Sequence, residues 1–186
     1  MQPNNLSTID IISGIFCKST KRVLELSTQK TIKFSTTIQR ISKVSLRPEI
    51  GSFVQFTGDY NGLAVMNFTS GAAMELYRSY MIAMGLPESD LAKEYTSSEV
   101  PDSIGEMTNQ IMGQSLSMIE EKYDLTAYCG QPKALALNSA ITLTIDSDYT
   151  ENRRISFNIE SHRFYLELSM EPIEFISIRR EKQPAS

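Results

Sequence analysis

The chain has 186 residues, of which 41% are hydrophobic and 22% are charged, and this suits one folded domain, since a typical domain has about 150 residues. The formal net charge is −4, and no block of basic residues is present that could follow the phosphates of a nucleic acid, which excludes that partner. No run approaches the roughly 20 apolar residues that cross a bilayer, and the N-terminus has no positively charged leader, so we expect a cytoplasmic protein without membrane contact.

The first half of the chain is predicted to contain a helix, a strand, a β-hairpin and a second helix. Apolar residues at helical spacing indicate the helices, and alternating apolar and β-branched residues indicate the strands. Ser7 with Asp10 would form a capping box on the first helix, and Thr69 or Ser70 would cap the second, which stops at Gly85. The predicted ranges are helix 8–26, strand 31–38, hairpin strands 50–57 and 63–68, and helix 71–84.

The second half is predicted to begin with the longest helix and to continue as strands. Pro101 suits the first turn of a helix, because its missing N–H would have no acceptor there. The alternation that starts at Leu135 is typical of a strand, and His162 is placed in the turn between the last two strands. The predicted ranges are a polar connector 87–98, helix 101–122, and strands 135–145, 155–159 and 164–170.

The order of elements is similar in the two halves, which predicts a pseudo-repeat of one helix and three strands. Sets of strands with helices between them favour an α+β fold, in which long helices pack on a mostly antiparallel sheet. No Gly-rich phosphate loop supports a doubly wound parallel sheet instead. We expect residues 1–178 to form this single domain and residues 179–186 to form a flexible tail.

The longest helix has two distinct faces, as seen when its residues are placed about 100° apart. The side that must face the core consists of Ile104, Met107, Ile111, Ser115, Met118 and Ile119. The opposite side consists of Glu106, Asn109, Gln110, Gly113, Ser117 and Glu120. Asn and an interior Gly both lower helix stability, by about 1 kcal/mol for the Gly. A partner surface that approaches closely at Gly113 would explain this cost, and a neutral surface with a tolerated glycine is the alternative.

The segment Glu106-x-x-Asn109-x-x-x-Gly113 resembles the signature helix of the CheC/CheX/FliY family of chemotaxis phosphatases, and of its CheX-type members in particular. The flanks are similar as well. Upstream lie a hairpin and a helix start of small residues like those of the family, and downstream lies a proline before the next strand. These flanking segments are 52–68, 70–73 and 130–132. The resemblance covers residues 50–145.

The resemblance implies a phosphatase that acts on the aspartyl phosphate of a response-regulator receiver domain, such as CheY, in chemotaxis or two-component signalling. By this resemblance, Asn109 orients the attacking water, and Glu106 binds a lysine of the receiver. Gln110, Gly113 and Ser117 would form the docking surface around them. No cofactor or metal of the protein's own is implied, because the Mg²⁺ that neutralises the phosphoryl group belongs to the receiver.

Some relatives have the motif twice, but the corresponding positions here offer only Asp10 and Ser13 in the first helix and Glu75 and Arg78 in the second. We therefore expect one site per chain and, as in CheX-type members, a homodimer that forms through sheet edges. Two other hypotheses stay open. One is a non-catalytic adaptor that binds a receiver domain or a flagellar-switch component, and the other is a sensor of a small ligand.

The remaining candidate residues favour ordinary structural roles. His162 is the only histidine and is expected to be a solvated turn residue. Cys17 and Cys129 lack the spacing of a metal site or a disulfide framework, and we expect reduced, buried or half-buried thiols. The methionines of the central helices are expected to fill the core. An acidic loop with Asp146, Asp148 and Glu151 is expected to be a solvated turn rather than a cation site.

Overall fold

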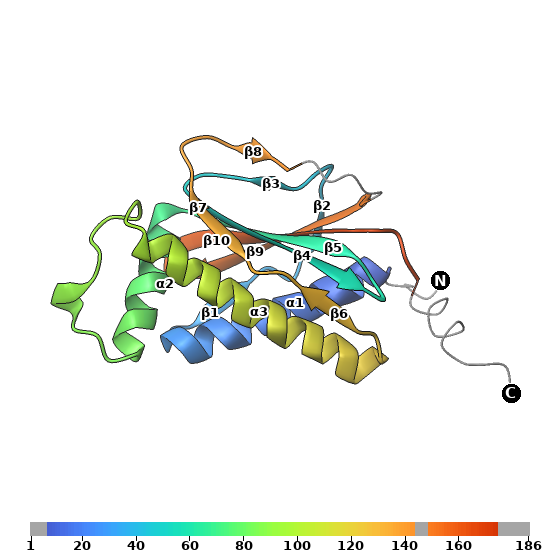
Figure 1. Cartoon of the computed structure of the whole chain (residues 1–186), viewed down its shortest axis with the longest axis horizontal. Helices are drawn as coiled ribbons and strands as arrows, with labels where there is room; N and C mark the ends of the chain where they lie inside the picture. Colours follow the sequence, from blue (N-terminus) through green and yellow to red (C-terminus); the bar gives the residue numbers. More distant parts are fainter. Residues whose placement is uncertain (1–6, 144–148, 175–186) are drawn as a thin grey trace, which may run out of the picture.

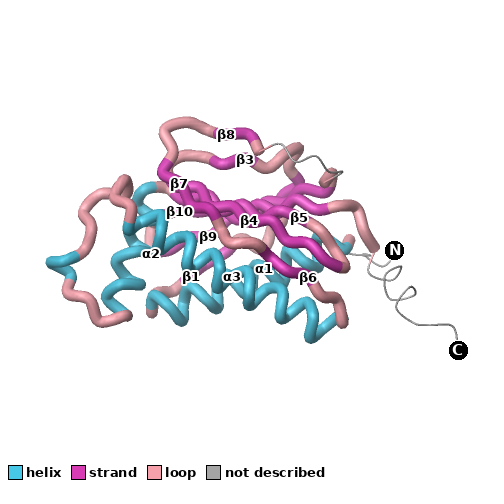
Figure 2. The backbone as a smooth tube through the Cα atoms, viewed as in Figure 1, coloured by secondary structure: helices cyan, strands magenta, loops and turns pink. Residues whose placement is uncertain are grey.

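The computed structural model describes residues 7–143 and 149–174. Three helices cover one face of a strongly twisted antiparallel sheet, and a two-stranded ribbon covers the other (Figures 1 and 2). The predicted α+β class is therefore confirmed. The helices are α1 Thr8–Thr28, α2 Ser70–Ala83 and α3 Glu99–Tyr123, and the short 3-10 helix η1 Glu88–Asp90 lies in the connector before α3.

Eight strands form the main sheet in the order β1-β9-β10-β5-β4-β6, with β2 also pairing with β9 and β7 with β4. The ribbon consists of β3 and β8. Strands from the first half are β1 Ile32–Phe34, β2 Gln39–Arg40, β3 Ser45–Leu46, β4 Ile50–Gly58 and β5 Gly62–Phe68. Those from the second half are β6 Ala127–Cys129, β7 Lys133–Ala136, β8 Ile141–Thr142, β9 Glu151–Ile159 and β10 His162–Met170.

The predicted pseudo-repeat is present, but each half contributes five strands rather than three. Each half consists of a helix, two short strands, one ribbon strand and a long hairpin. The short strands pair across the halves: β1 and β2 extend the β9–β10 hairpin, whereas β6 and β7 extend the β4–β5 hairpin. Because β3 of one half also pairs with β8 of the other, neither half completes its sheet alone.

Two of the predicted strands are broken in the structure. Of the predicted strand 31–38 only β1 is formed, because the chain leaves β9 after Phe34 and returns to it as β2, which begins at Gln39, just beyond the predicted range. The predicted strand 135–145 divides into β7 and β8, because Leu137 turns to donate its N–H to the Glu49 carbonyl and is buried beneath the ribbon. Its last residues, including Ile145, lie outside the described residues. Strands β2, β3 and β6 were not predicted.

The predicted start and end of α2 are confirmed. Thr69 is the N-cap residue, and its side-chain oxygen accepts the Ala72 N–H at 3.2 Å. At the other end, Gly85 adopts a φ of 91°, and the Leu86 N–H donates to the Met81 carbonyl at 3.0 Å. This pattern is a Schellman motif, which favours glycine because of the left-handed backbone.

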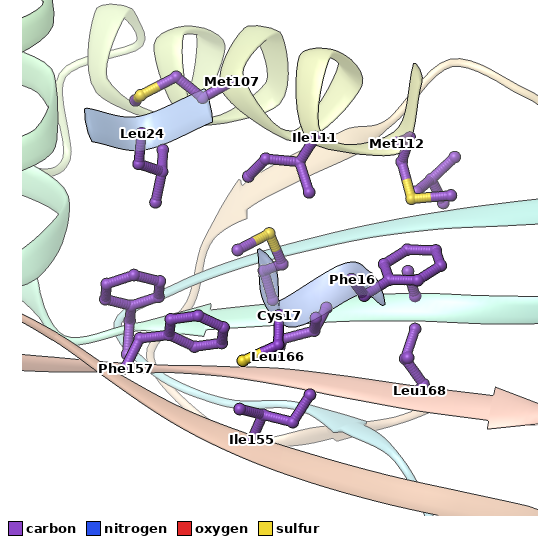
Figure 3. Close-up of a cluster of buried hydrophobic side chains, with 14 of the residues drawn as sticks. Phe16, Cys17, Leu24, Met107, Ile111, Met112, Ile155, Phe157, Leu166 and Leu168 are labelled. Atoms are coloured by element: carbon purple, nitrogen blue, oxygen red, sulfur yellow. The ribbon is translucent and has the colours of Figure 1, made fainter. Parts of the chain in front are cut away.

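The main core lies between the helices and the sheet (Figure 3). Phe16 and Leu24 of α1 and Ile111 of α3 meet Phe157 and Leu166 of the sheet in this core. All five side chains are almost fully buried, and the helical residues recur at the spacing of one helix face. The periodicity therefore identified the inward face of α3, but on α1 it was correct only for the first turns: Phe16 is buried, whereas Leu26, which has the same helical spacing, is 73% exposed and Leu24 takes its place in the core.

The sulfur-containing residues follow the predictions with one exception. Met107 and Met112 are buried in the core, whereas Met84, beyond the end of α2, is exposed. Cys17 is buried and Cys129 is half-buried, and both are free thiols. Burial raises the pKa of the Cys17 thiol to about 12, so it stays protonated at neutral pH.

Buried polar side chains attach the ribbon to the outer face of the sheet. The Asn67 side chain accepts the Arg47 N–H at 2.7 Å and donates to the Ser45 carbonyl at 2.9 Å. Glu167 accepts the Ser45 N–H at 3.1 Å, and its other oxygen lies 2.7 Å from Arg154 Nη2. Strand β3 pairs with β8 on one edge, and these side chains supply backbone partners on its other edge, which faces the sheet.

Ser7 and Asp10 do not form the predicted capping box. Ser7 is the N-cap of α1, but its hydroxyl donates to Asp10 Oδ2 at 2.6 Å instead of capping a backbone N–H. Arg153, which is 3% exposed, donates through Nε to Asp10 Oδ1 at 2.6 Å and also pairs with Glu151. Burial raises the pKa of Asp10, but the hydrogen bonds from Arg153 and Ser7 outweigh it and leave the pKa below its ordinary value.

We predict that Asn67→Ala lowers the free energy of unfolding by about 1–3 kcal/mol, because it leaves the buried Ser45 carbonyl and the partly buried Arg47 N–H without partners. Urea denaturation measures this change. Asn138→Ala is the matched control, since Asn138 is exposed, and it should change stability by less than about 0.5 kcal/mol. Equal midpoints for the two variants would show that Asn67 does not hold the ribbon.

We predict that Asp10→Asn lowers the free energy of unfolding at pH 7 by about 1–3 kcal/mol, because Arg153 loses one of its two carboxylates. Since the pKa of Asp10 is lowered by folding, its contribution is present above the ordinary Asp pKa of about 3.9 and is lost as the pH falls through the folded value. In urea titrations at pH 7, 4 and 3, the difference in unfolding free energy between wild type and Asp10→Asn should become smaller at each lower pH. The exposed Asp90→Asn is the control, and an equal effect from it would contradict the assignment.

Candidate functional site

The inward face of α3 fixes how this helix is rotated on the sheet. Ile104, Met107, Ile111, Ser115 and Ile119 are all buried, as the periodicity predicted. Met118 is half-buried and lies against α1, where Ser19 Oγ is 3.3 Å from its sulfur. Any rotation of α3 about its axis would expose these residues, so the opposite face points outward.

All six residues predicted for the outward face are exposed, including Glu106, Asn109, Gln110, Gly113 and Ser117. Glu106 and Asn109 are three residues apart and therefore neighbours on the helix surface. Gln110 Nε2 donates to Glu106 Oε1 at 3.2 Å, which restrains this carboxylate. Asn109 differs, because its carboxamide makes no hydrogen bond with any residue in 7–143 or 149–174. Its amide oxygen and nitrogen are available to a group from outside.

Glu106 and Asn109 line a shallow hollow of about 250 Å³ between α3 and the chain that joins β6 to β7. Its lining consists of Pro101, Asp102, Gly105, Glu106, Asn109, Gln131, Pro132 and Ala134. A Cβ atom on Gly105 would lie 3.7 Å from Ala134 Cβ, an ordinary contact, so small residues on both sides leave the hollow open. The wall formed by residues 131–134 was not predicted, because it depends on how β6 and β7 pair with β4.

Nothing in the described part of the structure requires a glycine at position 113. A Cβ atom at this position would meet nothing within 4 Å, and the helix there has no left-handed φ. The fold itself would therefore accept alanine, which is more favourable in a helix by about 1 kcal/mol. The glycine is either a tolerated surface residue or a point at which a partner approaches.

The pseudo-equivalent part of α1 has no matching pair. Both long helices end with a left-handed C-cap residue, Gln29 or Asp124, and a strand begins three residues later. When the helices are aligned on these residues, Ile11 takes the place of Glu106 and Gly14 that of Asn109. Asp10 is paired with Arg153, and Glu75 of α2 is paired with Lys30.

The other candidate residues lie away from the outward face of α3 or outside the described residues. His162 is the first residue of β10, not a turn residue, and its ring packs on α2: a Cβ on Gly71 would come within 2.3 Å of Nδ1. Asp146 and Asp148 lie outside the described residues, whereas Glu151 pairs with Arg153. Within 7–143 and 149–174, no three His, Cys, Asp or Glu side chains are grouped so as to hold a metal ion.

None of the described helices has the length and apolar character needed to cross a membrane. No curated protein matches the sequence. A protein-family model described as "Protein of unknown function (DUF3334)" matches residues 2–185.

Several solved structures have a similar fold. The chemotaxis protein CheX from Desulfovibrio desulfuricans is 20% identical with a TM-score of 0.70, and the match covers 87% of this chain and 99% of that chain. A chain of the CheX–CheY–BeF₃–Mg²⁺ complex from Borrelia burgdorferi is 14% identical with a TM-score of 0.63, covering 86% and 97%. FliY from Thermotoga maritima is 18% identical with a TM-score of 0.64, covering 96% and 100%.

At these levels of identity the likeness establishes the fold, and the resemblance noted on the α3 motif is confirmed at that level. The match to the family model spans nearly the whole sequence and establishes the family. The chain therefore belongs to the family described as "Protein of unknown function (DUF3334)", and it has the fold of the CheC/CheX/FliY proteins.

Proposed function

We propose that this protein is a phosphatase that hydrolyses the aspartyl phosphate of a CheY-like receiver domain in chemotaxis or two-component signalling. The observation that supports this most directly is the Asn109 carboxamide, which is exposed, lacks a partner among the described residues and lies beside Glu106 at the hollow. The likeness to a chain of the CheX–CheY–BeF₃–Mg²⁺ complex supports a receiver domain as the partner.

The chemistry of the substrate matches what one neutral amide can supply. In an acyl phosphate the aspartate carboxylate is a good leaving group, and the receiver's own Mg²⁺ neutralises charge, so positioning of water is the main contribution still needed. Water attacks phosphorus, the P–O bond to the aspartate breaks, and inorganic phosphate and a proton are released. Asn109 can accept a hydrogen bond from this water through its oxygen and donate through its nitrogen without adding negative charge beside the phosphoryl oxygens.

Glu106 has a different role in this proposal. Its exposed carboxylate, restrained by Gln110, is placed to bind a lysine of the receiver and so fix the docked orientation. Gln110, Gly113 and Ser117 extend this surface along α3, where small and neutral side chains allow close approach. The proposal also includes a homodimer formed through the short strands at the ends of the sheet, such as β6, on which Tyr128 is 74% exposed.

We predict that Asn109→Ala lowers the rate of receiver dephosphorylation at saturation about 100-fold, since water positioning is lost, while stability changes by less than about 0.5 kcal/mol. Glu106→Ala should mainly weaken affinity for the receiver. Phosphate release from phosphorylated receiver domains of the same organism, followed as a function of receiver concentration, measures both the rate at saturation and the apparent affinity. Asn138→Ala is the control.

Equal rates for wild type and Asn109→Ala would remove the mechanism proposed for this residue. Tight binding of a phosphorylated receiver without any turnover by the wild-type protein would instead identify a non-catalytic adaptor. Because Asn109 makes no structural hydrogen bond within the described chain, a folding defect is not expected to complicate either result.

We predict that Gly113→Ala stabilises the protein by about 0.5–1 kcal/mol, as expected for a helix interior, and at the same time weakens receiver binding. The matched control is Gly14→Ala on α1, where a Cβ also meets nothing within 4 Å. This control should give the stability without the loss of binding. If Gly113→Ala binds the receiver as well as the wild type does, Gly113 is a tolerated surface residue and not a docking point.

A further inference from the structure

A β-bulge shapes the wall of the hollow opposite α3. Strands β6 and β7 pair with the same strand, β4, with Cys129 opposite Phe56 and Lys133 opposite Phe53. The chain advances four residues from Cys129 to Lys133, whereas their partners on β4 are three apart. One extra residue is therefore inserted here, and such bulges often redirect a side chain next to a functional site.

The bulge places Gln131 at the hollow. The preceding Gly130 still donates its N–H to the Gln55 carbonyl at 3.2 Å, and the following Pro132 has no N–H to donate. Gln131 lies between them, is exposed, and lines the hollow together with Asn109. Its carboxamide makes no hydrogen bond with any residue that the structure describes. Two free carboxamides, one from α3 and one from the β6–β7 bulge, thus border one hollow.

The chemistry of the lining separates these two amides from the other side chains. Asp102 and Glu106 are carboxylates and would repel a phosphoryl group, while the Pro, Gly and Ala residues have no side-chain donor. Asn109 and Gln131 are therefore the two lining residues whose side chains can donate a hydrogen bond to a phosphoryl oxygen. A second donor on the opposite wall would hold the phosphoryl group while Asn109 orients water.

We infer that Gln131 is a second positioning residue, which donates its amide N–H to the phosphoryl group of the docked receiver from the wall facing Asn109. This inference rests on the proposed function and deepens it. It assigns a residue outside the α3 motif to recognition of the phosphorylated form of the partner. The carboxylates of the same hollow would bind basic residues of the receiver, whereas the amides would bind its phosphoryl group.

The test compares Gln131→Glu and Gln131→Ala in the full chain, with Gln39→Glu as control. Glu has nearly the shape of Gln but cannot donate and repels the phosphoryl oxygens. Gln39 is also exposed on a short strand, β2, which lies at the opposite edge of the sheet from β6 and β7. The probe is a receiver domain of the same organism, measured with Mg²⁺ alone and with Mg²⁺ and beryllium fluoride, which imitates the phosphoryl group.

Gln131→Glu should weaken binding of the beryllium fluoride form about tenfold or more and leave binding of the unmodified receiver nearly unchanged, with Gln131→Ala intermediate. Gln39→Glu should match the wild type. Equal loss of both receiver forms would indicate a disturbed bulge and overturn the inference, as would wild-type behaviour of Gln131→Glu. If Asn109→Ala lacks activity while both Gln131 variants behave as wild type, only this inference fails. If the wild type neither binds nor hydrolyses any receiver, the proposed function fails and the inference fails with it.

Discussion

The burial of one face of α3 against the sheet is the constraint on which the candidate site depends. Ile104, Ile111 and Ile119 are each at most 1% exposed, and a rotation of α3 by a single residue, about 100°, would expose them and bury the polar face. The cost of exposing several large apolar side chains is about 1.5–3 kcal/mol each. The outward direction of Glu106 and Asn109 is therefore a consequence of core packing, and it needs no support from their own side chains.

The exchange of short strands between the two halves gives the site its second wall. Strands β6 and β7 follow α3 in the sequence but pair with β4 of the other half. The hollow is therefore bounded by a helix of one half and by a bulge whose position is set by a strand of the other. Because the register between β4 and these short strands decides where Gln131 lies, the geometry of the hollow depends on the cooperative assembly of the whole sheet.

The sequence was sufficient wherever the relevant signal was local. The periodicity of α3 predicted both of its faces, and the cap at Thr69 and the stop at Gly85 predicted the ends of α2. Non-local features could not be read in this way. The wall at Gln131 appeared only as a turn-like Gly-Gln-Pro segment, because a bulge is defined by its partner strand. The pairing of Asp10 with Arg153, 143 residues away, replaced a capping box that local spacing alone had predicted.

Exposed polar side chains without partners are common on any protein surface, so the freedom of Asn109 alone would be weak support for a function. The two halves of the fold allow a sharper comparison. At the aligned position on α1, Ile11 and Gly14 replace the acid and amide, and the neighbouring Asp10 is neutralised by Arg153. The α3 side has instead two amides without a partner among the described residues and a restrained carboxylate at one hollow, next to a glycine that the described fold does not require. One backbone plan thus accommodates both arrangements, and the α3 arrangement leaves polar groups free at a cost in helix stability, as expected for a surface that is completed by a partner.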